Sequence, residues 1–379
     1  MPIPDDAPVI QITIDVLSFV VNIGIFVNGM KASYHKYTLN FKQPSGTSRG
    51  VMKQKETWFL ILEKDEKLGI GECGILRGLS YDDRPEYEER LKWVCQNIHL
   101  PTAQLYRGLK EYPSIKFGLE QALLSLASEH PFLLFPSPFV SDEAPIPING
   151  LVWMGDKTFM LQQIKQKLAQ GFSCIKMKIG AIDFESELEL LKHIRKQFSK
   201  DDIELRVDAN GAFSPAGAVD KLDHLAKLDI HSIEQPIKSG QWEEMAQLCK
   251  ESPIPIALDE ELIGMTDVTK RKELLQTIEP HYIILKPSLI GGFAESARWI
   301  AMAEQNGIGW WVTSALESNV GLNAIAQWTY TLGNFLPQGL GTGSLYSNNF
   351  DSPLTVANGT LFYGKGVSWQ GDLIKKICI

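Results

Sequence analysis

Cysteine is scarce in this chain of 379 residues, and the few cysteines follow no disulfide or metal-binding spacing. They are odd in number and form no Cys-x-x-Cys pair; their positions are Cys73, Cys95, Cys174, Cys249 and Cys378. Neither a disulfide framework nor a zinc site is therefore indicated. Free thiols fit a reducing compartment, so we expect a cytoplasmic protein.

Charge of one sign never accumulates along the chain, which has no run of five like charges and carries a net charge of -8. This balance argues against a basic surface for nucleic acid and against a charged tail. A composition of 44% hydrophobic and 22% charged residues is typical of a globular protein with room for a barrel and a smaller domain. We expect a small-molecule partner, no nucleic acid and no stable membrane association; a homo-oligomer is compatible with the composition.

A secretory leader or membrane anchor is not indicated either. The longest apolar run, 9–27, contains Asp15 and Asn22 and follows the acidic pair Asp5-Asp6. A signal peptide begins with positive charge, and a membrane span tolerates an aspartate poorly. We therefore expect residues 1–29 to be an extension without a catalytic role, whose place in the native fold is left open, and folding to begin at Met30.

The first folded part has the pattern of hairpin strands followed by helices, which predicts an α+β domain over 30–135. The expected strands and helices lie at 56–62, 69–72, 84–96 and 115–130. Between strands, the Gly/Ser/Pro-rich segment 42–50 predicts an irregular and mobile flap.

From residue 136 the pattern changes to short apolar strands that alternate with helices of about a dozen residues. We expect strands near 147–153, 174–179, 203–208, 230–234, 255–258, 282–286, 309–313 and 337–341. About eight such βα units predict a TIM-like α/β barrel over 136–350. The last segment, 351–379, contains the turn Asn358-Gly359 and is expected to form a hairpin and return to the first domain.

Two lysines interrupt the second of these strands, Cys174–Ile179. Alternate residues of a strand project to one face, so Lys176 and Lys178 share a surface. Two neighbouring ammonium groups disfavour one another's protonation, which lowers the pKa. At least one of the two is therefore a candidate base near neutral pH.

Further polar residues end the strands that follow, in the order Lys178, Asp208, Glu234, Asp259 and Lys286. The successive steps are 30, 26, 25 and 27 residues, each about one βα unit. Any one of these residues alone would be an ordinary exposed charge, turn or helix cap. Their regular spacing instead places them at one level at the carboxyl end of the barrel, where the active sites of this architecture lie.

The three carboxylates, with no cysteine or histidine among them, are the ligand type of a hard cation such as Mg²⁺. A metal held between two lysine groups suits proton abstraction next to a carboxylate, because it neutralises the charge that develops. We expect the metal and the neighbouring ammonium to lower the pKa of the base lysine.

The ordered set Lys-x-Lys, Asp, Glu, Asp and Lys-Pro resembles the enolase superfamily, specifically its muconate-lactonizing subgroup, over nearly all of 30–379. The resemblance implies a modified (β/α)7β barrel with an N-terminal capping domain, and Mg²⁺ with Mn²⁺ as a substitute. The implied metal ligands are Asp208, Glu234 and Asp259. By the same resemblance Lys178 is the general base, Lys176 stabilises the enolate, and Lys286 lies on the opposite face.

Within the subgroup, the segments 44–50, 289–292 and 313–321 resemble the o-succinylbenzoate synthase family. That resemblance implies dehydration of a cyclohexadiene carboxylate that bears a hydroxyl and a succinyl group. N-acylamino acid racemases, dipeptide epimerases and muconate cycloisomerases use the same frame and stay open as alternatives, as does a silent binding barrel. Dipeptide epimerases carry an Asp-x-Asp at the eighth strand, which 339–345 lacks.

Five further residues are candidates for substrate binding. Arg206 either pairs with a barrel carboxylate or binds a substrate carboxylate. Ser314 and Glu317 follow the seventh strand, although Glu317 could equally brace the next helix. In the flap, Ser48 and Arg49 either close over the substrate or belong to a plain surface loop.

Overall fold

The computed structural model describes residues 29–47 and 50–378. The predictions for the extension, for Ser48 and for Arg49 therefore concern positions outside the described residues, apart from the start of folding near Met30.

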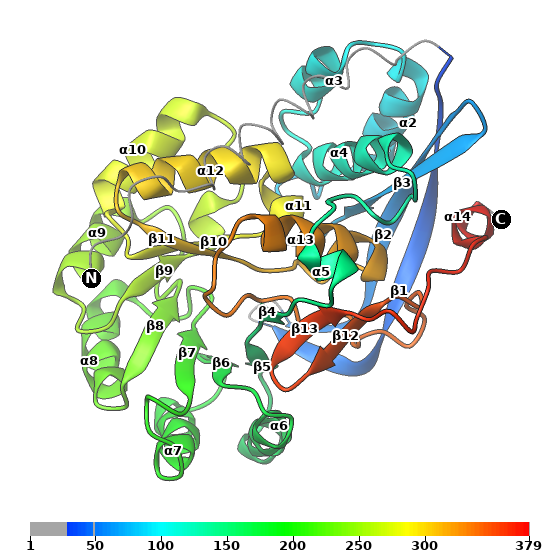
Figure 1. The fold of residues 1–379 in the computed structure, drawn as a ribbon. Coiled ribbons are helices and arrows are strands. Elements are labelled where there is room, and N and C mark those ends of the chain that lie inside the picture. Colours follow the sequence, from blue (N-terminus) through cyan, green and yellow to red (C-terminus); the bar gives the residue numbers. More distant parts are fainter. Residues whose placement is uncertain (1–28, 48–49, 379) are drawn as a thin grey trace.

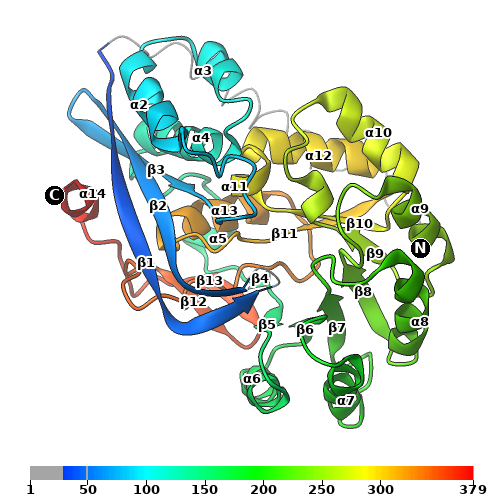
Figure 2. The same cartoon turned by 180° about the vertical axis from the view of Figure 1, so that it is seen from behind.

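The N-terminal module is a three-stranded antiparallel sheet covered by helices (Figures 1 and 2). Its strands are β1 (Lys31–Thr47), β2 (Gly50–Lys64) and β3 (Lys67–Gly74), and its helices are α2 (Tyr87–Asn97), α3 (Thr102–Gly108) and α4 (Pro113–Ala127). Helix α4 lies directly on β3 because Gly69 and Gly71 present no side chain there. A Cβ at Gly71 would lie 1.8 Å from the Gly118 carbonyl oxygen.

The segment predicted as an irregular flap is instead largely paired, since β1 extends to Thr47 and β2 begins at Gly50. Ser45 pairs with Met52, and the register shifts between Asn40 and Ser45. Pro44 falls inside this irregular stretch. A proline has no N–H to donate to a ladder, and a bulge lets the strand continue past it.

The barrel contains a seven-stranded parallel sheet in the order β11-β10-β9-β8-β7-β6-β5, surrounded by helices (Figure 1). The strands are β5 (Gly150–Val152), β6 (Cys174–Lys178), β7 (Glu204–Asp208), β8 (Ile230–Glu234), β9 (Ile256–Leu258), β10 (Tyr282–Leu285) and β11 (Gly309–Val312). The helices that alternate with them are α6 (Lys157–Ala169), α7 (Phe184–Arg195), α8 (Pro215–Ala226), α9 (Trp242–Glu251), α10 (Val268–Ile278), α12 (Phe293–Gln305) and α13 (Asn319–Thr331). Shorter elements are α5 (Pro138–Ser141), β4 (Ile146–Pro147), η2 (Glu260–Leu262) and α11 (Pro287–Ile290). The predicted fold class, a TIM-like barrel with an N-terminal cap, is confirmed.

An eighth segment closes the barrel by isolated bridges rather than by the predicted strand over 337–341. Gln338 bridges to Ile148, and Gly339 bridges to Thr313. The amide of Gly339 donates to the Val312 carbonyl at 2.8 Å. A Cβ at Gly339 would lie 2.4 Å from the Thr313 hydroxyl oxygen, so glycine permits this close approach.

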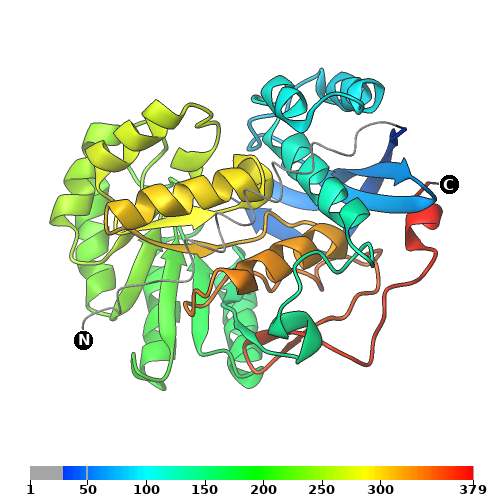
Figure 3. The same ribbon diagram turned by 45° about the horizontal axis from the view of Figure 1, so that its top comes forward.

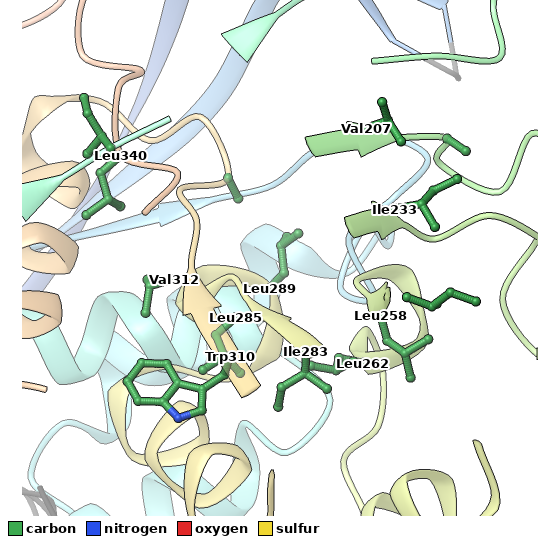
Figure 4. Packing of buried hydrophobic residues seen from close by; sticks show 14 of the residues in the cluster. Val207, Ile233, Leu258, Leu262, Ile283, Leu285, Leu289, Trp310, Val312 and Leu340 are labelled. Atoms are coloured by element: carbon green, nitrogen blue, oxygen red, sulfur yellow. The ribbon is translucent and has the colours of Figure 1, made fainter. Parts of the chain in front are cut away.

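Alternation along the barrel strands separates a helix-facing core from the polar interior. Figure 4 shows side chains of this core, among them Val207, Ile233, Leu258 and Leu285, all fully buried. Successive side chains of a strand point to opposite faces, so burying Val207 under the helices turns Asp208 toward the barrel interior.

The chain ends in the predicted hairpin and a short helix: β12 (Leu354–Ala357), β13 (Thr360–Tyr363) and α14 (Leu373–Ile377). Asn358 and Gly359 both have positive φ, as a two-residue hairpin turn requires. Trp369 and Leu373 pack in one cluster with Phe59 of the cap. The division into 1–29, 30–135, 136–350 and 351–379 stays a proposal.

Glu72 of the cap holds the start of a barrel helix. This carboxylate has no exposed surface and accepts hydrogen bonds from the Thr57 hydroxyl (3.0 Å) and from the amides of Ser318 and Gly321 (both 2.9 Å) at the N-terminus of α13. We expect Glu72→Ala to lower the free energy of unfolding by about 3 kcal/mol, since it leaves several buried donors unpaired. Denaturant unfolding measures the loss, and exposed Glu63→Ala is the control. An equal, small effect of both variants would contradict the expectation.

Glu120 of α4 makes a similar contact, because it accepts from the Phe293 amide at 2.6 Å where α12 begins. Burial raises its pKa from the ordinary 4.5 to about 7, although Lys116 and the amide oppose the shift. A carboxyl with a raised folded-state pKa stabilises the fold fully below pH 4.5, and this contribution is lost as pH rises through about 7. The free energy of unfolding of the wild type should therefore fall relative to Glu120→Gln over this window. Paired unfolding curves across the range check this, and a constant difference would contradict it.

Candidate active site

The two lysines of β6 contact carboxylates from the next two strands. Lys176 Nζ lies 2.6 Å from Glu234 Oε2 and 3.3 Å from Asp208 Oδ2. Lys178 Nζ donates to the same Asp208 oxygen at 3.0 Å. The side chains of Lys176, Asp208 and Glu234 are almost fully buried, whereas 13% of the Lys178 side chain is exposed. Lys178 is thus the more accessible of the pair.

Lys286 approaches the same carboxylates from β10. Its Nζ donates to Asp259 and lies 3.8 Å from Glu234 Oε1. The structure therefore brings together the six residues predicted as base, partner, metal ligands and opposite lysine. Among the described residues, buried Glu234 Oε1 has no hydrogen-bond partner.

Burial and charge act against each other on the three carboxylates. For Asp208, burial raises the pKa, but Lys178 and Lys176 outweigh it and hold the pKa well below the usual range. For Glu234, burial and then Asp208 raise the pKa to about 7. For Asp259, burial raises the pKa despite Lys286. The neighbouring lysines therefore do not fully compensate for the burial of Glu234 and Asp259.

The pKa values of Lys176 and Lys286 are raised, whereas a base near neutral pH needs a lowered pKa. Burial alone lowers the pKa of Lys176, but Glu234 and Asp208 outweigh it and the net pKa is raised. For Lys286 burial is likewise outweighed, by Asp259 and Glu234, and the pKa is raised. The expected mutual lowering within the lysine pair therefore does not apply to Lys176. Both residues are suited to remain cations.

The donor set fits a hard divalent cation. Over 29–47 and 50–378, no group of three or more Asp, Glu, His or Cys side chains is already gathered as a metal site. The carboxylate oxygens of Asp208, Glu234 and Asp259 instead contact ammonium groups. All the donors are oxygen atoms, which Mg²⁺ prefers. A bound Mg²⁺ would also give the Glu234 oxygen a partner and lower the raised pKa of that carboxyl.

These groups open into a cavity of about 340 Å³ between barrel and cap. Polar groups at its base include Lys176, Lys178 and Lys286, and apolar side chains cover it. Its lining also includes Met52, Leu76, Leu79, Leu151, Trp153, Asn210, Glu260, Thr313, Ser314, Leu316, Gly339, Gly341, Thr342 and Leu345. The cavity suits a small carboxylate with an apolar body.

Asn210 and Glu260 belong to the site but were not predicted. Lys178 Nζ donates to Asn210 Oδ1 at 2.7 Å, and Asn210 Nδ2 donates to Glu260 Oε1 at 3.0 Å. Asn210 has a φ of 44°, which asparagine tolerates better than most residues. The sequence Asp-Ala-Asn-Gly showed a turn, but not that its amide would reach the base lysine.

The substrate-binding candidates separate into one that lines the cavity and two that do not. Ser314 lines it and shares a 2.7 Å hydrogen bond with the Thr342 hydroxyl. Glu317 is buried and accepts from the Ser288 hydroxyl and, at 2.8 Å, from the Ala315 amide. Neither partner belongs to the following helix, and Glu317 is not among the described lining residues, so substrate binding and bracing of that helix both stay predictions.

Arg206 lies within the barrel, beneath the level of the site, and is 1% exposed. Its Nε donates to Glu204 at 2.6 Å, its Nη1 donates to the Pro337 carbonyl, and its guanidinium lies over Trp311 at 4.2 Å. These contacts favour the barrel-carboxylate alternative over substrate binding.

Comparisons with known proteins concern the chain as a whole and its fold. A family model described as "Enolase C-terminal domain-like" matches residues 160–371. The o-succinylbenzoate synthase of Desulfotalea psychrophila is 46% identical over 366 residues, which cover 88% of this chain and 99% of that protein. The crystal structure of MenC from the same organism has a TM-score of 0.79 at 43% identity and covers 88% of this chain and 100% of its own. A hydrophobic dipeptide epimerase from a Flavobacteria bacterium is 25% identical, with 79% of this chain and 86% of the epimerase covered.

Proposed function

The chain belongs to the enolase superfamily as a carbon–oxygen lyase, and on that premise we propose that it is an o-succinylbenzoate synthase of menaquinone biosynthesis. It would dehydrate 2-succinyl-6-hydroxy-2,4-cyclohexadiene-1-carboxylate to 2-succinylbenzoate. The observation that carries the proposal is the pair Lys178 and Lys286, which line one cavity together with Asp208. The similarity of 88% of the chain to one such synthase supports this reaction over the others of the superfamily.

Lys178 would act as the base, because its Nζ lines the cavity and Asn210 and Asp208 hold it in place. It takes the proton from the ring carbon that carries the carboxylate, and the negative charge spreads into that carboxylate as an enediolate. The electron pair then forms a ring double bond as the hydroxyl leaves the neighbouring carbon. Lys178 returns its proton to the hydroxyl, so the products are water and an aromatic ring.

Lys176 and Lys286 would stabilise the negative charge of the enediolate. The carboxylates around them raise the pKa of both, so that both stay protonated near neutral pH. Asp208, Glu234 and Asp259 would hold Mg²⁺ or Mn²⁺. When bound, the metal supplies positive charge for the substrate carboxylate.

The segment 339–345 supports a lyase over a dipeptide epimerase. Gly339, Gly341 and Thr342 line the cavity, and this stretch contains no carboxylate to bind a substrate ammonium group. A racemase of N-acylamino acids remains the second candidate, because it needs the same base and metal.

An assay with the cyclohexadiene substrate and Mg²⁺ tests the proposal, with the aromatic product followed by its absorbance. We expect the aromatic product to form much faster than an N-succinylamino acid is turned over. Turnover of the N-succinylamino acid is followed as deuterium exchange at its α-carbon. The proposal would be overturned if folded protein supplied with Mg²⁺ formed no aromatic product.

The remaining expectations concern the surroundings of the protein. Among the described residues, no helix has the length and apolarity needed to cross a membrane. We propose a small-molecule carboxylate as substrate and a cytoplasmic location, in line with the free cysteines.

A further inference from the structure

A second cavity, of about 400 Å³, lies between the cap and the barrel. Its walls come from α3 and α4 of the cap and, on the barrel side, from α12 and the segments that follow β9 and β10. Figure 3 shows α4 of the cap running beside the barrel helices in this region. The lining residues differ entirely from those of the active-site cavity.

Positive charge is concentrated in this cavity, although the whole chain has a net charge of -8. Its charged lining residues are one carboxylate, Glu295, and five cations: Arg107, Lys110, Lys116, Arg271 and Arg298. Two nearby carboxylates outside the lining are already engaged: Glu120 accepts from the start of α12, and Asp267 caps α10. Counting both still leaves the cations in excess.

The buried part of this charge is built into the fold. The side chains of Lys116 and Arg271 are 10% and 3% exposed. Both contact Glu295, at 2.6 and 2.5 Å, and Arg298 contacts it at 2.6 Å. One carboxylate thus serves three cations, and burying unbalanced charge is costly unless an anion joins it.

An unpaired hydroxyl and apolar residues complete the cavity. Tyr106 lines it, and its buried hydroxyl has no hydrogen-bond partner within the described part of the chain. Buried hydroxyl groups normally have a partner, so an acceptor is missing here. The lining also includes the apolar residues Leu109, Met265, Leu289 and Ile290.

We propose that this cavity binds a small amphiphilic anion, an apolar ring or chain that carries a carboxylate. The carboxylate would lie against Arg107 and Lys110, whose side chains are exposed, and the apolar body against Met265. The proposal does not depend on the reaction that the active site catalyses.

Equilibrium dialysis with 1-naphthoate tests this proposal, with neutral 1-naphthalenemethanol as the matched probe without charge. The active-site cavity also suits a carboxylate with an apolar body, so the binding is measured in Lys286→Met, which removes a cation of that site; a thermal unfolding curve verifies that this variant is folded. We expect saturable binding there, and roughly tenfold weaker binding of the neutral probe.

The double substitution Arg107→Gln/Lys110→Gln, made in the Lys286→Met background, should weaken naphthoate binding roughly tenfold. Both side chains are exposed at the cavity, so the fold should be retained, and a thermal unfolding curve verifies this. Absent binding, equal binding of the neutral probe, or binding unchanged by the double substitution would each overturn the proposal.

Discussion

Replacing Lys178 by alanine is expected to lower the turnover of the cyclohexadiene substrate by about 10²–10⁴-fold, the usual contribution of a general base. The physical reason is its position, because Lys178 lines the cavity and its Nζ lies 3.0 Å from Asp208 and 2.7 Å from Asn210. Lys176 and Lys286 are not expected to take its place, because neighbouring carboxylates outweigh burial and raise the pKa of both.

Steady-state kinetics and deuterium exchange at the acidic carbon measure the loss together, because both need the same proton transfer. Lys200→Ala is the matched control: that side chain is 64% exposed, lies 3.9 Å from Asp229 and is not among the described lining residues of the cavity. Lys178→Ala should keep the unfolding midpoint of the wild type. If Lys178→Ala kept the turnover of the wild type, Lys178 would not be the base.

Removal of divalent metal is expected to reduce turnover by about 10³-fold or more, since a metal ion supplies several kcal/mol to the charged transition state. Dialysis against EDTA measures the loss, and added Mg²⁺ or Mn²⁺ should restore the activity. The reason lies in Glu234, whose carboxyl has a pKa raised to about 7 by burial and Asp208 and keeps one oxygen without a hydrogen-bond partner among the described residues.

Asp208→Asn and Asp259→Asn should each raise the Mg²⁺ concentration needed for half-maximal activity, because each removes a charged donor. Asp220→Asn, with its side chain 81% exposed, is the control and should behave as the wild type. Full activity after exhaustive chelation would show that the three carboxylates serve the lysines alone.

Most of the predicted site depended only on spacing along the chain. Each βα unit returns the chain to the same end of the barrel, so Lys178, Asp208, Glu234 and Asp259 had to meet once the repeat was recognised. The eighth strand, predicted over 337–341, did not form as a regular strand. This segment is joined to its neighbours by single bridges at Gln338 and Gly339.

Other features depended on contacts between distant segments. Segment 42–50 has a loop composition, yet Ser45, Gly46, Thr47 and Gly50 pair in the ladder of β1 with β2, because each strand satisfies backbone groups of the other. Arg206 and Glu317 could each have faced substrate or protein. Their partners, Glu204 and the Ser288 hydroxyl, became known only with the packing.

The sequence by itself determined the fold class, the strand ends that carry the reactive groups and the oxygen-only character of the donor set, because these follow from local periodicity and residue chemistry. The tertiary structure decided which lysine of the pair is almost fully buried and which is partly exposed, although both line the cavity, and how the cap loop with Leu76 and Leu79 covers the site. It also decided that Asn210 reaches Lys178 and that cations gather between cap and barrel. These outcomes depend on burial and on distances between residues far apart in the chain, which local sequence patterns do not contain.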